Sequence, residues 1–145
     1  MILTVMTTSA ELLNQGWRIH KAGDFAGAER VYRQVSATEP KNANAWCYLG
    51  IALFDTRRLD ESVAAYQRAV AIQPVFSIAW NNLGNSRLQL HRYKEAIAAS
   101  DTALRSDGTY VSSSIDLARA LPGYGQLQAG VSAGPAALVP PAGAP

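Results

Sequence analysis

The sequence predicts an all-α fold built from three helix-turn-helix units of 34 residues each. The chain matches itself when it is shifted by 34 residues, and within each unit the apolar residues recur at the spacing of an α-helix. The shift superposes the following residues: Gly16, Gly50 and Gly84, then Trp46 and Trp80, then Pro40 and Pro74. The three units are therefore expected to span residues 9–42, 43–76 and 77–110.

The second unit illustrates how each pair of helices is recognised. An apolar stripe at residues 46, 49, 50 and 53 marks its first helix, and a second stripe begins at Leu59 after a polar turn. The second helix is expected to stop at Pro74, because proline has no N–H to continue the hydrogen-bond ladder. Gly23-Asp24 and His91-Arg92 serve as the turns of the other two units.

The repeated glycines lie in the middle of helices, where glycine costs about 0.5–1 kcal/mol relative to alanine. Each glycine therefore predicts a close approach of the partner helix. We expect small residues of the facing helix to complete these contacts, namely Ala28, Ser62 and Ala96. The repeated aromatic residues are expected to fill the core rather than to bind a cofactor, and these are Tyr32, Trp46, Tyr66 and Trp80.

Both ends of the chain depart from the repeat. Residues 1–8 form a short leader. Residues 111–121 have the pattern of the first helix of an incomplete fourth unit, which we expect to act as a capping helix. Residues 122–145 hold 6 Ala, 5 Gly and 5 Pro with no charged residue, so this tail is expected to be disordered. A natural extension, a shifted reading frame and a truncated gene all remain open as origins of the tail.

Charge and cysteine content exclude several classes of function. The chain has 13 Lys and Arg residues against 11 Asp and Glu residues, and their even distribution argues against a nucleic-acid partner. The single cysteine, Cys47, allows no internal disulfide, which suits a reducing, cytoplasmic location. The apolar stretch at residues 1–6 is too short for a signal peptide or a membrane span, so we expect no membrane association.

Catalytic patterns are not recognisable in the sequence. His20 and His91 fall at different positions of different units, and we expect both to be exposed near turns. The carboxylates are scattered, and no glycine loop suited to phosphate binding occurs. We therefore expect neither enzyme activity, nor a cofactor, nor a metal site.

The repeat resembles a known family. The second unit contains Trp46-x-x-Leu49-Gly50 followed by Ser62, Tyr66, Ala69 and Pro74, and this pattern resembles the tetratricopeptide repeat. The third unit repeats it as Trp80-x-x-Leu83-Gly84, whereas the first unit matches it less closely. The resemblance covers about two thirds of the chain. It implies a right-handed α-solenoid, in which the first helix of each pair lines a concave groove.

The groove implied by the resemblance supplies the candidate binding residues. They comprise amide, aromatic and aliphatic side chains, which suit an extended peptide: amides pair with its backbone, while apolar groups bury its side chains. The candidates are Asn14, Trp17, Tyr48, Ile51, Asn82 and Asn85. Their asparagines resemble the array in O-GlcNAc transferases, although Tyr48 interrupts it and Asp116 ends it.

A second subfamily, which binds chaperones, holds a carboxylate with Lys, Asn and Arg residues in the same groove. The matching positions of this chain offer no cation, which excludes such a clamp. They are Leu13, Trp17, Tyr48, Ile78 and Asn82.

Three functions remain open from the sequence. The leading one is an adaptor that binds a peptide or a partner helix in the groove. The second is a detached or truncated regulatory region of a larger enzyme, such as a protein glycosyltransferase. The third is self-association through the incomplete fourth unit.

Overall fold

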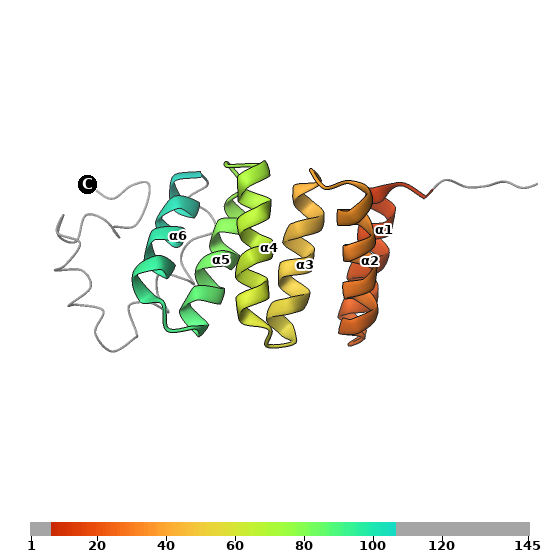
Figure 1. Cartoon of the computed structure of the whole chain (residues 1–145), viewed down its shortest axis with the longest axis horizontal. Helices are drawn as coiled ribbons and strands as arrows, with labels where there is room; N and C mark the ends of the chain where they lie inside the picture. Colours follow the sequence, from red (N-terminus) through yellow and green to blue (C-terminus); the bar gives the residue numbers. More distant parts are fainter. Residues whose placement is uncertain (1–6, 107–145) are drawn as a thin grey trace, which may run out of the picture. The chain divides into compact units, whose positions relative to one another are not determined.

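The computed structural model describes residues 7–106, and every regular element in this range is an α-helix. The helices follow one another in pairs (Figure 1): α1 (Ser9–Lys21), α2 (Phe25–Thr38), α3 (Ala43–Asp55), α4 (Leu59–Ile72), α5 (Ser77–Gln89) and α6 (Tyr93–Ser106). The predicted all-α class of three helix-turn-helix repeats is confirmed. The expected capping helix and tail lie outside the described residues, as do the first six residues of the leader.

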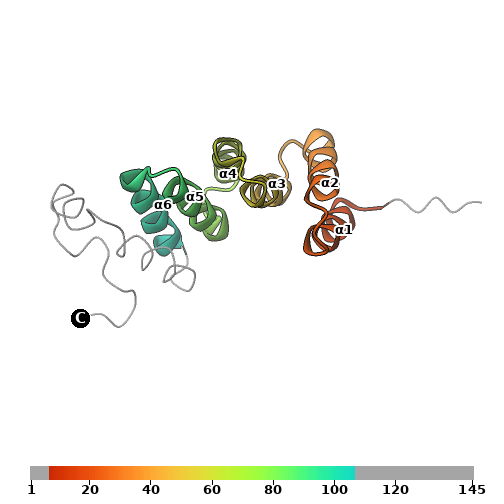
Figure 2. The ribbon, with the colours of Figure 1, turned by 90° about the horizontal axis from the view of Figure 1, so that it is seen from below.

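The chain divides between Ile72 and Gln73 into two compact units. In the first unit, α1 packs against α2, α2 against α3, and α3 against α4 (Figure 2). In the second unit, α5 packs against α6. The first unit thus contains two complete helix pairs, and the second contains one.

Local sequence signals explain where the helices begin. Thr8 caps α1 and forms a capping box with Glu11, because each residue bonds the backbone N–H of the other. The side chains of Asp24 and Asn42 cap α2 and α3 by accepting from the amides of Gly27 and Ala45. These caps satisfy amides that have no partner inside the helix.

The repeated spacing of tryptophan and proline has a structural counterpart in both units. The indole N–H of Trp46 donates to the carbonyl oxygen of Pro40 at 2.9 Å, and Trp80 makes the same bond to Pro74 at 2.9 Å. Both indoles are partly buried. Helices α2 and α4 end two residues before these prolines, at Thr38 and Ile72. Each tryptophan therefore ties the start of a helix to the segment that precedes it.

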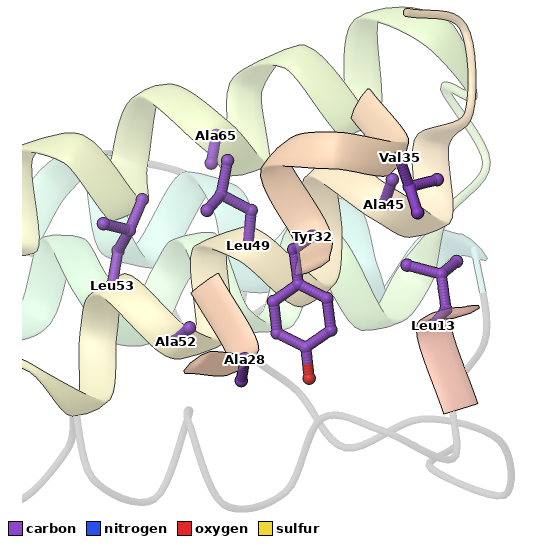
Figure 3. Packing of buried hydrophobic residues seen from close by; sticks show 9 residues of the cluster. All are labelled: Leu13, Ala28, Tyr32, Val35, Ala45, Leu49, Ala52, Leu53 and Ala65. Carbon is purple, nitrogen blue, oxygen red and sulfur yellow. The ribbon is translucent and has the colours of Figure 1, made fainter. Parts of the chain in front are cut away.

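Buried side chains of α1 to α4 form the core of the first unit (Figure 3). Tyr32 and Val35 of α2 belong to one cluster with Leu49 and Leu53 of α3, and all four are at most 2% exposed. Leu13 of α1 joins the same cluster. Burial of this apolar area is the main term that stabilises the unit.

The repeated glycines do lie where helices approach closely, and the atoms nearest to them come from the expected facing helices. A Cβ atom on Gly50 would lie 2.5 Å from Tyr66 Cε1, and one on Gly16 would lie 2.6 Å from Tyr32 Cε1. At these two glycines the nearest atoms therefore belong to a tyrosine ring, four positions after the small residue of the facing helix. At Gly84, Ser100 takes the place of the ring with its Oγ atom 2.7 Å from such a Cβ atom, and the expected residue Ala96 contributes its carbonyl oxygen at 3.2 Å.

A network of charges joins the two helix pairs of the first unit. Glu29 of α2 binds Arg33 at 2.7 Å and Arg58 at 2.7 Å, and Arg58 also binds Glu61 at 2.6 Å. Burial raises the pKa of Glu29, but the hydrogen bonds and charges of Arg33 and Arg58 outweigh burial, so its pKa lies below the ordinary value. Arg58 precedes α4, so Glu29 connects α2 to the turn between α3 and α4.

None of the helices within residues 7–106 has the length and apolar character needed to cross a lipid bilayer.

Candidate functional site

Two aromatic rings from successive helix pairs meet in the first unit. Trp17 of α1 and Tyr48 of α3 have ring centroids 5.8 Å apart with their planes tilted by 52°. Ile51 lies one turn after Tyr48 on α3. All three side chains are partly buried, so each keeps some surface for a ligand. We call Trp17, Tyr48 and Ile51 the aromatic shelf.

The shelf rests on a fully buried ring. Tyr48 stacks on Tyr32 with centroids 5.4 Å apart and planes 21° from parallel. Tyr32 is 0% exposed and lies over Gly16. Burial raises the pKa of the Tyr32 phenol, and the neighbouring Tyr48 adds to this effect, so the hydroxyl stays protonated at neutral pH. Packing on two helices thus fixes Tyr48 before any ligand arrives, which reduces the entropy lost on binding.

His20 contacts Trp17 of the shelf. The sequence predicted that His20 is exposed. That expectation was wrong, because only 5% of His20 is exposed and its Nε2 atom lies 2.6 Å from Oδ2 of Asp55. Since a carboxylate only accepts, Nε2–H donates to Asp55. The imidazole also contacts Trp17, with ring centroids 5.1 Å apart. The pair connects α1 to the last residue of α3, and the imidazole packs against Trp17.

The remaining candidates differ in their surroundings. Asn14 lies one turn before Trp17 on α1 and is exposed. Asn82 and Asn85 lie one turn apart on α5, in the second unit, and both are partly buried. The structure thus brings together Trp17 and Tyr48 by direct ring contact, places Asn14 beside Trp17 on the same helix, and presents Asn82 and Asn85 as a separate pair.

The other residues considered for chemistry carry no reactive arrangement in the described part of the chain. His91 is exposed, as expected, and its Nδ1 atom lies 2.7 Å from the Tyr93 hydroxyl. Cys47 is buried on α3. Among residues 7–106, no three His, Cys, Asp or Glu side chains come together in a way that could hold a metal ion.

Sequence reasoning missed two features that support the shelf. The first is the His20–Asp55 pair, and the second is the stacking of Tyr48 on Tyr32. A signal for the second was present, because Tyr32 was assigned to the core and Tyr48 to the neighbouring helix. No repeat pattern indicated the His20–Asp55 pair, since these residues lie 35 positions apart rather than 34.

Family models agree with the repeat pattern. Two models described as tetratricopeptide repeat match residues 14–75 and 65–98. Together they span residues 14–98, which is more than half of the 145 residues. The sequence matches none of the curated proteins.

Solved structures with the same fold include several repeat domains. MamA is 24% identical with a TM-score of 0.70, over 77% of this chain and 67% of that chain. The first TPR domain of Spaghetti (RPAP3), solved with the HSP90 peptide SRMEEVD, is 18% identical with a TM-score of 0.74, over 88% of this chain and 99% of that chain.

The second TPR domain of human RPAP3, solved with the HSP70 peptide SGPTIEEVD, is 17% identical with a TM-score of 0.73, over 78% of this chain and 96% of that chain. These likenesses concern the fold. The two family models, which together span residues 14–98, show that the chain belongs to the tetratricopeptide-repeat proteins.

Proposed function

We propose that the chain is a protein-protein interaction adaptor that binds an extended peptide on the aromatic shelf. The observation that carries this proposal is the ring contact of Trp17 with Tyr48 at 5.8 Å, made by side chains that are only partly buried. Large aromatic groups that retain exposed surface are the side chains that contribute most to peptide and protein binding. That related domains were solved with HSP90 and HSP70 peptides supports a peptide as the class of ligand.

The polar candidates are expected to form hydrogen bonds with the peptide backbone. Asn14 lies beside Trp17 and offers both a donor and an acceptor to a peptide backbone. Tyr48 replaces the asparagine expected at its position, and its ring is held on Tyr32. A regular row of asparagines that binds the peptide backbone is therefore not proposed here. At Tyr48 we expect an apolar side chain of the ligand to pack on the ring instead.

The proposed ligand does not need a free terminal carboxylate. At the positions that would clamp one, Leu13 is 5% exposed and Ile78 is 38% exposed, and both are apolar. Trp17 and Tyr48 occupy two further clamp positions without positive charge. A peptide selected for this site should therefore bind equally well with a free or an amidated C-terminus, as measured by calorimetry. A loss of more than about tenfold on amidation, which is 1.4 kcal/mol, would contradict this.

The proposal is tested with peptides selected from a random library against the full chain. Trp17→Ala should weaken the selected peptides about tenfold or more, because it removes a large apolar contact. Asn14→Ala should weaken them about twofold to tenfold, the equivalent of one hydrogen bond, and it leaves the fold intact because Asn14 is exposed.

Gln67→Ala is the matched control, since Gln67 is exposed on α4 and forms no part of the shelf. It should leave the affinity unchanged. Failure to select any peptide, or equal binding by the Trp17→Ala, Asn14→Ala and control variants, would remove the proposed function.

A further inference from the structure

A hollow in the first unit shares no residue with the aromatic shelf. It has a volume of about 240 Å³ and is lined by α2, α3 and α4. Trp46, Leu49 and Leu53 of α3 form its apolar side together with Ala64 and Ala65 of α4. Leu49 and Leu53 are at most 2% exposed, so the floor is firmly packed. We call this hollow the Trp46 pocket.

Charged side chains from α2 and α4 surround the Trp46 pocket. Arg33 and Arg68 contribute positive charge, and Glu61 contributes negative charge. Glu61 is bound by Arg58 at 2.6 Å, which neutralises it. Arg33 donates its Nε–H to Glu29 at 2.7 Å. The rim is therefore positive on balance, because Arg68 adds a charge that neither of these pairs uses.

Arg68 differs from the other arginines of the rim in its contacts. Its guanidinium carbon lies 4.7 Å from the centre of the Trp46 ring, and it makes no ion pair with a carboxylate of residues 7–106. A guanidinium stacked on an aromatic ring keeps the N–H groups on its edge available for an acceptor. The stacking also holds this cation at the mouth of an apolar pocket.

We propose that the Trp46 pocket is a second docking site, which binds a partner segment carrying one bulky apolar side chain next to an Asp or Glu residue. The volume decides the size of the occupant, because about 240 Å³ lies below the range of roughly 300–1,000 Å³ for sites of drug-sized molecules. The apolar side chain fills the pocket, and the neighbouring carboxylate binds Arg68. Charge complementarity of this kind selects the partner and aligns it.

The tail of this chain does not fit the same description. Residues 122–145 contain no charged side chain, so they cannot supply the carboxylate beside an apolar residue. Ile115-Asp116-Leu117 is the one stretch of residues 107–145 in which an Asp stands between bulky apolar residues. We take the occupant to be an acidic segment of another protein, and a Trp46 signal that moves in Asp116→Asn without any peptide would assign the pocket to this chain instead.

The test follows the three indole N–H signals of the full chain by NMR, each assigned with a single Trp→Phe variant. The probes are three synthetic peptides, acetyl-SELDLS-amide, its basic analogue acetyl-SKLKLS-amide and its apolar-deleted analogue acetyl-SEADAS-amide. The acidic peptide should shift the Trp46 signal in a saturable manner and leave the Trp17 signal unmoved. The two analogues should shift neither signal.

Variants of Arg68 then assign the charge. Arg68→Gln should weaken the acidic peptide about twofold to fivefold, and Arg68→Glu should transfer the preference to the basic peptide. Lys94→Gln is the matched control, because Lys94 is exposed on α6 of the second unit and should not affect binding. Far-UV circular dichroism checks that each variant keeps its helices.

Three results would overturn the proposal. They are a Trp46 response that is equal for the acidic and basic peptides, unchanged affinity of Arg68→Gln, and no response of Trp46 at millimolar peptide. If the acidic peptide shifts Trp17 instead, the pocket is excluded as its site while the proposed function of the shelf gains support. If no peptide binds the aromatic shelf, only the proposed function fails, and the proposal for the Trp46 pocket is unaffected.

Discussion

The three helix turns each place one residue in the left-handed backbone region, at the same position of every repeat. These residues are Gly23 with φ of 97°, Arg57 with 66° and His91 with 62°. In each turn the amide of this residue donates to the carbonyl three positions back, and the next amide donates five positions back. This pair of bonds is the Schellman motif that closes a helix. Only the first turn uses glycine, the residue that adopts this conformation without strain.

Arg57→Gly should therefore stabilise the first unit by about 0.5–1 kcal/mol. A side chain in the left-handed region costs roughly 1–2 kcal/mol, part of which is offset by the greater entropy of glycine in the unfolded chain. Urea denaturation followed by far-UV circular dichroism measures the change. Gly23→Ala is the matched opposite, because no atom lies within 4 Å of the added Cβ and only backbone strain opposes it. A loss of stability in Arg57→Gly, or none in Gly23→Ala, would refute the strain assigned to these turns.

Gly50→Leu should destabilise the first unit by about 1–3 kcal/mol, because overpacking forces the neighbouring elements to move. Even the Cβ atom would lie 2.5 Å from Tyr66 Cε1, and Tyr66 is only 2% exposed. Thermal denaturation of the variant measures the loss. The same substitution in a Tyr66→Leu background should cost less, since the ring that covers Gly50 is then absent. An unchanged melting temperature in the single variant would count against this packing.

At the scale of elements, the His20–Asp55 bond joins α1 to α3, the first helices of the two helix pairs in the first unit. Asp55→Ala should cost about 1–3 kcal/mol, because it leaves the buried Nε2 atom of His20 without an acceptor. Asp55→Asn keeps an oxygen acceptor and should cost less. The exposed substitution Gln67→Ala should change the free energy of unfolding by less than about 0.5 kcal/mol. Equal stability of Asp55→Ala and Gln67→Ala would show that the bond does not join the helices.

Sequence reasoning succeeded for elements and failed for contacts that leave the repeat. The helices could be predicted because a shift of 34 residues aligns glycine, tryptophan and proline, each of which has a strong local effect on a helix. The contact of His20 with Asp55 spans 35 residues, so comparison of repeat positions hides it. The tyrosine rings over Gly16 and Gly50 could not be predicted, because sequence position alone does not fix the direction of a ring.

The shelf could be predicted only in part for the same reason. Trp17, Tyr48 and Ile51 were identified individually from the position of the groove in related repeats. Their ring contact and the support from Tyr32 depend on the distance between α1, α2 and α3, which packing sets. The Trp46 pocket left no sign in the sequence, since it forms where side chains of three helices fail to fill the space between them.

At the scale of the whole molecule, charge balance makes stability depend on pH. At neutral pH, 13 Lys and Arg residues face 11 Asp and Glu residues, and the formal net charge is +2. Protonation of the carboxylates at acidic pH removes the negative charges while the 13 cations remain and the 2 histidines become charged. The folded chain then gains self-repulsion and loses its ion pairs, which predicts weaker folding in acid.

Glu29 should account for a distinct part of this acid sensitivity. Its pKa in the folded chain lies below the ordinary value of 4.5, because the pull of Arg33 and Arg58 outweighs burial. Its contribution is therefore fully present above about pH 4.5 and is lost as the pH falls through the lower, folded-state pKa. Urea denaturation between pH 7 and pH 3 should show a falling midpoint, and Glu29→Gln should be less stable at pH 7 with a shallower dependence on pH. Gln67→Ala should keep the slope of the unaltered chain, so an equal slope in Glu29→Gln would show that the Glu29 network does not link the helix pairs energetically.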